Sequence, residues 1–410
     1  MITFIHTADI HFGMENYGKI DSQSGIHTRL LDFERALNFC IDYAIEQQVD
    51  FFLFAGDAYK TAHPTPTQQR LLLKCFLRLY NAHIPVVMVV GNHDQPITFG
   101  KAHALSIFSE IPIEGFHVIA QPTSFSLDTK NGPIQIVGIP WPNKAHIALN
   151  NTHTQKTSHE LVEHISNRIS EIINYYAHKL DPKLPAILTG HLTVNTGIFS
   201  GSEKRAIYGS DPMFLPSQLA IHPFDYVALG HLHRYQNLNP TGHPPLVYSG
   251  SLERIDFGER KEEKGFCMVT IKEKKNTEIS FIKTPTRPFI QIEVQIKPDE
   301  EQTKQILSAL KKYSILNAII KIIYYIPENE LDKVNLSKVE SACATALYCA
   351  GIIPRFNPKI RECRAMLDAT MNLDCLLTEY FSSKQTLINR KESLLKLAHE
   401  IINSSTTTAY

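Results

Sequence analysis

The chain contains 410 residues, of which 43% are hydrophobic and 20% charged, and its 41 basic side chains equal its 41 acidic ones in number. This composition is typical of a globular protein with two or three domains, and it excludes an intrinsically disordered or strongly polybasic chain. Because the net charge is zero, a binding site for a polyanion would have to be a local patch.

The spacing of the cysteines and the hydropathy of the chain indicate the cellular compartment in which we expect the protein. The seven cysteines never occur with CxxC spacing, which argues against a disulfide scaffold and against a cysteine zinc site. The first residues lack the pattern of a secretory signal, and no apolar run reaches the roughly 18 residues of a membrane span. We therefore expect a cytoplasmic protein without a membrane partner.

Apolar strands alternate with amphipathic helices from the start of the chain. We predict strands at residues 2–7, 51–55 and 85–90, with helices at 29–48 and 68–81 between them. The apolar runs are continuous rather than alternating, which is typical of parallel strands buried on both faces. This order predicts βαβ units and therefore an α/β fold.

The same pattern continues further along the chain. The predicted elements are a long helix at 159–178 and strands at 134–139, 186–189, 225–229, 246–249, 265–271 and 278–282. A proline-bearing linker at 284–288 then precedes a strand, a helix and a strand, which predicts a small appended α+β domain. These last three elements are predicted at 289–296, 300–313 and 318–325.

From about residue 361 the chain is predicted to be helical, with helices at 368–381 and 386–402. We therefore expect three parts, at residues 1–284, 289–358 and 361–410.

Five of the predicted strands end in residues that can bind metal ions. The motifs are Asp9-x-His11, Gly56-Asp57, Gly91-Asn92-His93-Asp94, Gly190-His191 and Gly230-His231-x-His233. Side chains two apart on an extended segment face the same way, so the Asp9 and His11 pair can point at one place. Nitrogen and oxygen donors without thiolate suit manganese, iron or zinc. Seven donors suit two ions that share a carboxylate, about 3.5–4 Å apart.

Taken singly, each motif has a simpler interpretation. A histidine near a strand end is usually a hydrogen-bonded structural residue, and Asp57 alone would be read as a turn former or helix cap. All five motifs in one predicted domain are hard to explain as turns, so we favour the two-metal interpretation. For His6 we favour a structural role or a role in supporting a metal ligand, and for Trp141 packing in the core or at the rim of the site, although Trp141 could stack on a base.

Several basic side chains are candidate phosphate contacts, although solvated surface residues are the interpretation that we favour. They are Lys204, Arg205, Arg254, Arg260 and Lys261.

In this order, the five motifs resemble those of the calcineurin-like metallophosphoesterase superfamily. The stretch YVALGHLH at 226–233, followed by SGSLERIDFGE at 249–259 and KGF at 264–266, is more specifically similar to the SbcD nuclease family. These nucleases are the prokaryotic counterparts of the nuclease subunit in the double-strand-break repair complex. The resemblance covers nearly the whole chain and implies a four-layer αββα sandwich with a small α+β capping domain that binds DNA.

The resemblance also implies roles for the motif residues, with two manganese ions as cofactors and magnesium, iron or zinc as possible substitutes. One ion would be bound by Asp9, His11, Asp57 and His233. The other would be bound by Asp57, Asn92, His191 and His231, so that Asp57 bridges the two. His93 would be the catalytic histidine, which protonates the leaving oxygen, and Asp94 would orient it. Lys60, where many relatives carry an acidic residue or histidine, is interpreted as a solvated lysine.

The function that the resemblance implies is a manganese-dependent DNA exonuclease and endonuclease that acts on duplex ends, hairpins and single strands in double-strand-break repair. An SbcC-type ATPase would be its partner, bound through the C-terminal helices, and the protein would be a homodimer. Packing of those helices on their own domain is the open alternative. The rival functions are hydrolysis of a small phosphodiester or phosphoprotein, and a catalytically silent DNA-binding scaffold.

Overall fold

The computed structural model describes residues 1–96, 100–110, 114–142, 158–201, 211–298, 300–327, 330–356, 373–383 and 387–406. The chain divides into two compact units. Unit 1 comprises Met1–Ile292, Tyr313–Lys321 and Glu340–Gly351, and unit 2 comprises Glu293–Lys312, Ile322–Val339 and Ile352–Tyr410. Among the helices so described, none combines the length and the apolar character that a membrane span requires.

Unit 1 contains two six-stranded sheets. In spatial order, the first consists of β14 (Asn276–Lys283), β13 (Gly265–Glu273), β1 (Ile2–Thr7), β2 (Phe51–Phe54), β3 (Val86–Val89) and β4 (Phe116–Ile119). The second consists of β11 (Gln236–Asn237), β12 (Leu246–Tyr248), β10 (Tyr226–Gly230), β7 (Ala186–His191), β6 (Gly132–Ile139) and β5 (Thr123–Thr129). A two-stranded sheet pairs β8 (Thr193–Val194) with β9 (Met213–Phe214).

Parallel pairing joins the central strands of both sheets. Strands β1 to β4 are parallel to one another, and so are β6, β7, β10 and β12. The prediction of buried parallel strands is therefore confirmed. Because parallel strands end at one edge of a sheet, residues that follow β1, β2 and β3 lie close together, as do those that follow β7 and β10.

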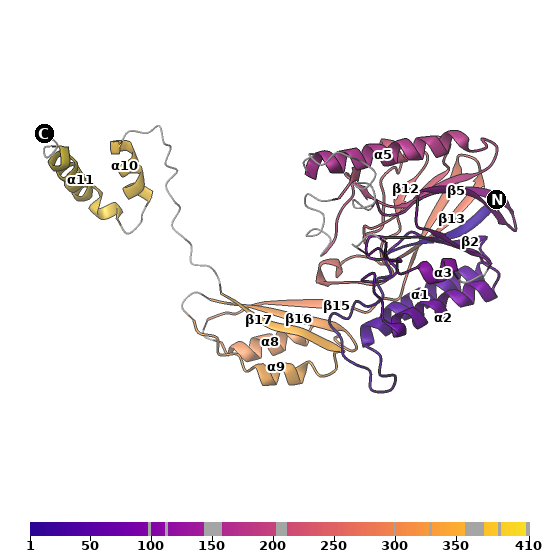
Figure 1. Ribbon diagram of the computed structural model, residues 1–410. Coiled ribbons are helices and arrows are strands. Elements are labelled where there is room, and N and C mark those ends of the chain that lie inside the picture. The colour runs from indigo at the N-terminus through magenta and orange to yellow at the C-terminus, as the bar shows by residue number, and fades with distance from the viewer. Residues whose placement is uncertain are drawn as a thin grey trace. The chain divides into compact units, whose positions relative to one another are not determined.

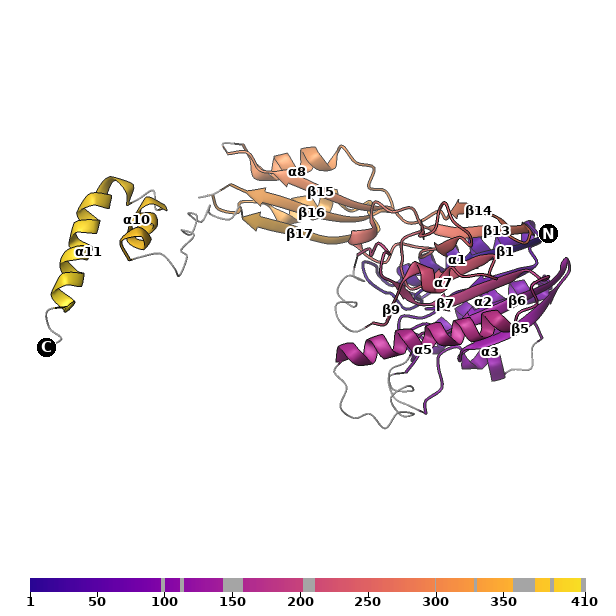
Figure 2. The same cartoon turned by 90° about the horizontal axis from the view of Figure 1, so that it is seen from above.

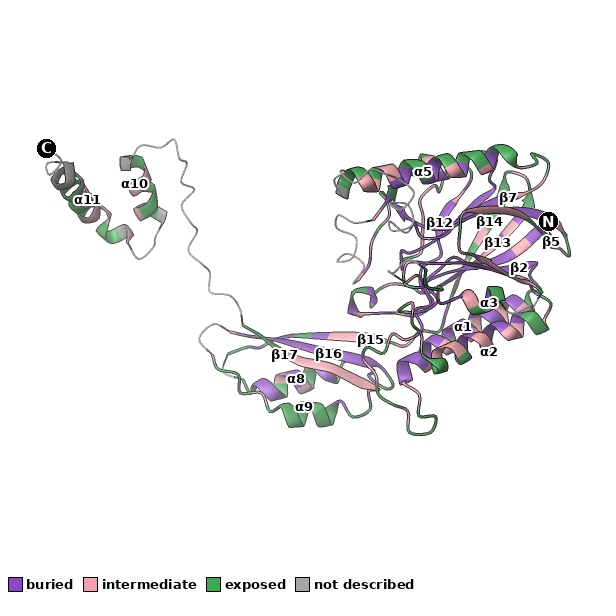
Figure 3. Cartoon of the chain, in the orientation of Figure 1, coloured by how far each residue is buried: buried purple, intermediate pink, exposed green. Residues whose placement is uncertain are grey.

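Helices cover the outer faces of the two sheets. They are α1 (Thr28–Glu46), α2 (Pro66–Asn81), α3 (Ser106–Glu110), α5 (Ser158–Lys179) and α7 (Pro216–Leu219). Figure 1 shows α1, α2 and α3 on one side of the paired sheets and α5 on the other, and Figure 2 shows α5 lying along β5, β6 and β7. Figure 3 marks many residues of these helices as exposed, whereas nearly all residues of the central strands β1, β2, β3, β7 and β10 are buried.

Side chains alternate along each strand, so the two sheets contribute to three hydrophobic cores. Phe51 and Leu53 of β2 face the second sheet and pack with Ile187 of β7. Phe52 and Phe54 point the other way, into a core shared with α1 and α2. Residues of β6, β7 and β10 make the third core with α5. The four-layer αββα fold is thus confirmed.

Residues 289–356 contain a three-stranded sheet and two helices. The strands, in spatial order, are β15 (Phe289–Gln295), β16 (Ile319–Ile326) and β17 (Tyr348–Phe356), and the helices are α8 (Gln302–Leu310) and α9 (Leu336–Ala342). Further on lie α10 (Leu373–Ser383), the 3-10 turn η2 (Ile388–Arg390) and α11 (Lys391–Thr406). Helices α10 and α11 contact each other.

Some elements differ from the sequence prediction. Helix α2 starts two residues earlier than predicted because Thr65 and Gln68 form a capping box around Pro66. Strands β4, β5 and β17 were not predicted, because most of their residues are polar or only half-buried. Helix α11 begins at Lys391 rather than at residue 386, and part of the predicted helix at 368–381 lies outside the described residues.

Candidate metal centre

The sequence motifs converge at the carboxyl ends of strands from both sheets of unit 1. The histidine and carboxylate atoms form three overlapping groups in which all donor atoms lie within 4.8 Å of one another. The groups are Asp9, His11 and His233; His11, Asp57 and His93; and Asp57, His191 and His231. Asp57 belongs to two of them, so we describe the cluster from that residue outward.

Asp57 lies at the middle of the cluster. Its Oδ2 is 3.6 Å from His11 Nε2 and 3.4 Å from His191 Nε2, and its Oδ1 accepts a 2.9 Å hydrogen bond from the His93 backbone N–H. Burial alone would raise the pKa of Asp57, but the surrounding histidines outweigh it and hold the pKa well below its usual value. The carboxylate is therefore ionised and can be shared by two cations.

The first half of the cluster contains Asp9, His11 and His233, all of them buried. The Nε2 atoms of His11 and His233 are 3.1 Å apart. Both oxygens of Asp9 lie 3.1 Å from the backbone N–H of His231, which fixes this carboxylate between the two sheets. Burial lowers the pKa of His11, so its imidazole is neutral and offers a lone pair.

The second half contains Asn92 and two histidines. Asn92 Oδ1 lies 3.0 Å from His191 Nε2 and 3.2 Å from His231 Nδ1. His191 Nδ1 donates to the Ala55 carbonyl at 2.8 Å, so its Nε2 is the atom turned toward Asp57. Burial would lower the pKa of His191, but the Asp57 carboxylate outweighs it and raises the pKa to about 9. The Asp57 carboxylate therefore favours a positive charge in this half of the cluster.

These donors fit divalent cations. They are nitrogens and oxygens, all buried except the half-buried Asn92, that converge from several directions, with no thiolate and no lysine or arginine among them. In each half, imidazole nitrogens approach other donor atoms at 3.0–3.2 Å, distances that a shared cation would explain. Asn92, a neutral donor, would make the second half less anionic.

Backbone conformation brings these side chains together. Asp9, His11, Asp57 and His231 have φ values of 54°, 52°, 59° and 103°, in the region that favours glycine. The expectation that Asp9 and His11 converge because they continue an extended strand is therefore wrong. Strand β1 ends at Thr7, and sharp turns after it direct the two side chains inward.

Glycines beside the ligand candidates leave room for them. A Cβ on Gly91 would lie 2.2 Å from Asp57 Oδ1. A Cβ on Gly56, whose φ is +103°, would lie 2.3 Å from His191 Nδ1. Both positions thus require glycine, the first for space and the second also for its backbone conformation.

Asp94 has a different partner from the one expected. Its buried carboxylate accepts hydrogen bonds from the backbone N–H groups of Asp57, Ala58, Tyr59 and Gly91 at 2.9–3.2 Å. Burial, followed by repulsion from Asp57, raises its pKa to about 6. The prediction that Asp94 orients the His93 ring is wrong, because this carboxylate is occupied by the turn that holds Asp57.

His93 is instead oriented by the backbone carbonyl of Lys60, which lies 2.8 Å from its Nδ1. Its Nε2 faces Asp57 Oδ2 at 4.0 Å, and 45% of its side chain is exposed. It is therefore the cluster histidine most open to a substrate. The Lys60 contact could not be found from the sequence because any residue supplies a carbonyl.

Two further carboxylates lie behind the histidines. Glu259 Oε1 is 2.9 Å from His233 Nδ1, and Asp211 Oδ2 is 3.7 Å from His231 Nε2. Burial would raise the pKa of Glu259, but Lys264 outweighs it and lowers the pKa to about 2. Glu259 lies in the predicted family-specific stretch, but its position 26 residues after His233 gives no sequence signal of their contact.

The remaining candidates have four different outcomes. His6 is structural, as favoured, since it lies between the Tyr226 hydroxyl and the Leu229 carbonyl. Trp141 lies beside the cluster, its ring centroid 4.8 Å from that of His231. Arg254 is not a free phosphate contact, because its guanidinium binds the carbonyls of Glu262 and Arg287. Lys204 and Arg205 lie outside the described residues.

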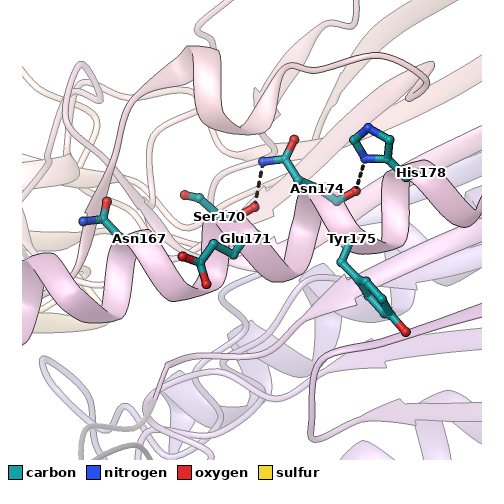
Figure 4. Close-up of a pocket in the computed structure, with 6 residues that line it drawn as sticks. All are labelled: Asn167, Ser170, Glu171, Asn174, Tyr175 and His178. Atoms are coloured by element: carbon teal, nitrogen blue, oxygen red, sulfur yellow. Dashed lines mark hydrogen bonds between the residues drawn. The ribbon is translucent and has the colours of Figure 1, made fainter.

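A cavity of about 590 Å³ lies elsewhere, along α5 (Figure 4). It is lined by Asn167, Ser170, Glu171, Asn174, Tyr175 and His178. None of the candidate metal ligands lines it, and it has no group of donors comparable with the cluster around Asp57. The chemistry of the described residues therefore points to the strand ends.

Comparison with known proteins agrees with this geometry. Residues 2–235, more than half of the chain, match the calcineurin-like phosphoesterase family, and the chain belongs to that family. It is therefore a metal-dependent phosphoesterase, a hydrolase, as predicted.

The individual relatives and solved structures share between 13% and 27% of their aligned residues with this chain. The chain is 27% identical over 327 residues, 79% of each chain, to the SbcD subunit of nuclease SbcCD from Staphylococcus saprophyticus, which confirms the expected resemblance. A protein of Thermus thermophilus is 14% identical with a TM-score of 0.39, covering 68% of this chain and 98% of the other. A dimetal phosphatase from Danio rerio is 13% identical with a TM-score of 0.41, covering 69% and 99%.

Proposed function

We propose that this protein is a manganese-dependent DNA nuclease, both exonuclease and endonuclease, that works with an SbcC-type ATPase in double-strand-break repair. The observation that carries the proposal is the convergence of side chains from five strand ends on Asp57. Similarity to a nuclease subunit across most of the chain supports DNA as the substrate over a small phosphate ester.

The proposed ligand sets follow the two halves of the cluster. One ion would be held by Asp9, His11, Asp57 and His233, and the other by Asp57, Asn92, His191 and His231. The ions would supply Lewis acidity at the scissile phosphate and lower the pKa of attacking water. Asp57 supports this arrangement because the same Oδ2 faces both His11 and His191.

His93 would be the proton donor. Its Nδ1–H is engaged by the Lys60 carbonyl, which leaves Nε2 as the atom that exchanges a proton. Because the ring is partly exposed beside Asp57, its Nε2–H would be available to protonate the leaving sugar oxygen of a bound phosphodiester. Asp94 contributes indirectly, since it fixes the turn from Asp57 to Tyr59.

The partner proposal rests on the C-terminal helices. Helices α10 and α11 contact each other and still expose Tyr380, Leu397 and Ile401. Such an exposed apolar helical surface suits a coiled coil of the partner ATPase. We also retain, as proposals, the homodimer and the division into parts at 1–284, 289–358 and 361–410.

The test compares substrates with Mn²⁺ and with chelator. We expect the purified chain to cleave end-labelled linear duplex DNA with Mn²⁺, and His93→Ala to bind Mn²⁺ and DNA but lose cleavage by about 10²–10⁴-fold. Cleavage of a chromogenic phosphodiester but not of DNA would favour a small-substrate enzyme. DNA binding without any cleavage by the wild type would favour a scaffold.

A further inference from the structure

Two residues of the segment between β12 and β13, Glu259 and Lys264, contact His233. The Glu259 carboxylate touches its ring, with Oε1 2.9 Å from Nδ1. The Lys264 ammonium donates to its backbone carbonyl at 2.9 Å. Glu259 and Lys264 are themselves paired at 2.9 Å, and both are buried.

Further interactions hold the Glu259 carboxylate in this position. The other oxygen of Glu259 accepts the Ile255 backbone N–H at 2.9 Å as well as the Lys264 ammonium. The turn η1 (Phe257–Glu259), capped by Asp256, presents the carboxylate. A buried ion pair is costly to desolvate, and breaking it leaves a buried charge unpaired, so its position is strongly constrained.

The ionised carboxylate determines which nitrogen of His233 is free. A carboxylate can only accept hydrogen bonds, so His233 Nδ1 must carry the proton. In the neutral ring the lone pair is then on Nε2, the atom that faces His11 Nε2 at 3.1 Å. An anionic partner on the far nitrogen also makes an imidazole a stronger donor to a metal.

Two other histidines of the cluster contact backbone carbonyls instead of a carboxylate at Nδ1. The ring of His191 donates to the carbonyl of Ala55, and that of His93 lies against the carbonyl of Lys60. The ring of His233 bonds to the Glu259 carboxylate at 2.9 Å, whereas the Asp211 carboxylate lies 3.7 Å from Nε2 of His231. The two halves of the cluster are therefore not equivalent.

We propose that Glu259, held by Lys264, is a positioning residue that fixes the His233 tautomer and so strengthens metal binding in the half formed by Asp9, His11 and His233. This inference rests on the proposed two-metal function and deepens it, because it assigns unequal affinities to the two ions. It also gives the SGSLERIDFGE…KGF stretch a physical role.

The test measures Mn²⁺ binding without any activity assay. Metal-free full-length protein is titrated with Mn²⁺, and the free ion is followed by electron paramagnetic resonance. We expect the wild type to bind two ions. In Glu259→Gln, one dissociation constant should rise by about 10–100-fold while the other changes little.

Glu253→Gln is the matched control. Glu253 lies in the same segment and is equally buried, but it accepts the backbone N–H groups of Arg254 and Arg287 and touches no histidine of the cluster. Binding of both ions should be unchanged in this variant. Equal weakening by both substitutions would show a merely structural role and overturn the proposal.

A double variant tests the proposal even if Glu259→Gln fails to fold. Glu259→Gln combined with Lys264→Met removes both buried charges together, so neither is left unpaired. It should weaken the same single ion. Wild-type binding in this double variant or in Glu259→Gln would overturn the inference alone, whereas failure of the wild type to bind two ions would overturn the proposed two-metal function.

Discussion

Gly91→Ala tests how closely the centre is packed. The added Cβ would lie 2.2 Å from Asp57 Oδ1 and 2.4 Å from its backbone nitrogen, whereas real Cβ contacts stay above 3.0 Å. Asp57 must therefore shift by at least 0.8 Å, the difference between 3.0 and 2.2 Å. It cannot rotate freely, because the same Oδ1 accepts the His93 N–H and the backbone nitrogen donates to Asp94.

The expected cost has two parts. Overpacking should lower the free energy of unfolding by about 1–3 kcal/mol. Displacing the shared carboxylate by about 1 Å should lower Mn²⁺-dependent phosphodiesterase activity by about 10²-fold. Denaturant unfolding and steady-state kinetics at saturating Mn²⁺ measure the two effects on the same preparation.

The control for Gly91→Ala is Gly132→Ala. Gly132 has a φ of +113° with no atom near its Cβ position, so alanine strains the backbone far from the cluster. It should cost stability, about 1 kcal/mol, but leave metal binding and activity unchanged. If Gly91→Ala keeps wild-type activity, or if Gly132→Ala loses activity equally, the packing argument is refuted.

Three further predictions follow from single contacts. Mn²⁺ at about 100 times its Kd should raise the free energy of unfolding by about 2.7 kcal/mol per bound ion, and no change would contradict the ligand assignment. Mn²⁺ should quench the fluorescence of Trp141, the single tryptophan, more than diamagnetic Zn²⁺ does, because the Trp141 ring lies beside His231. Equal quenching by the two ions would show that they bind elsewhere. A hydrogen bond from Cys343 lowers the pKa of the partly exposed Cys349, so alkylation of Cys349 should have its midpoint at a lower pH than that of an ordinary thiol. Cys343→Ala should shift that midpoint upward, and a wild-type midpoint near 9 would contradict the contact.

The residues of the centre were predictable where they follow buried strands directly. Asp57 and His191 come after continuous apolar runs, and the structure brings them within 3.4 Å of each other. What the sequence could not predict depends on distant or backbone groups. The partner of His93 is a carbonyl, and the partner of His233 lies 26 residues away on a 3-10 turn.

The assignment of Asp94 failed for a related reason. The family resemblance implied that its partner is the His93 ring, but a buried carboxylate is stabilised best by several donors at once. The turn at Asp57, Ala58 and Tyr59 offers three backbone N–H groups that point the same way. Nothing in the local sequence of either segment records that they meet.

The same long-range dependence explains why the centre lies between the two sheets. Asp9 and His11 follow β1 of the first sheet, whereas His233 follows β10 of the second. Asp57 follows β2, whereas His191 ends β7 of the second sheet. Each half of the cluster therefore takes donors from both sheets, and their spacing depends on the apolar core packed between them. Interiors packed at this density resist small displacements, so that core sets the geometry at Asp57 although none of its side chains offers a ligand.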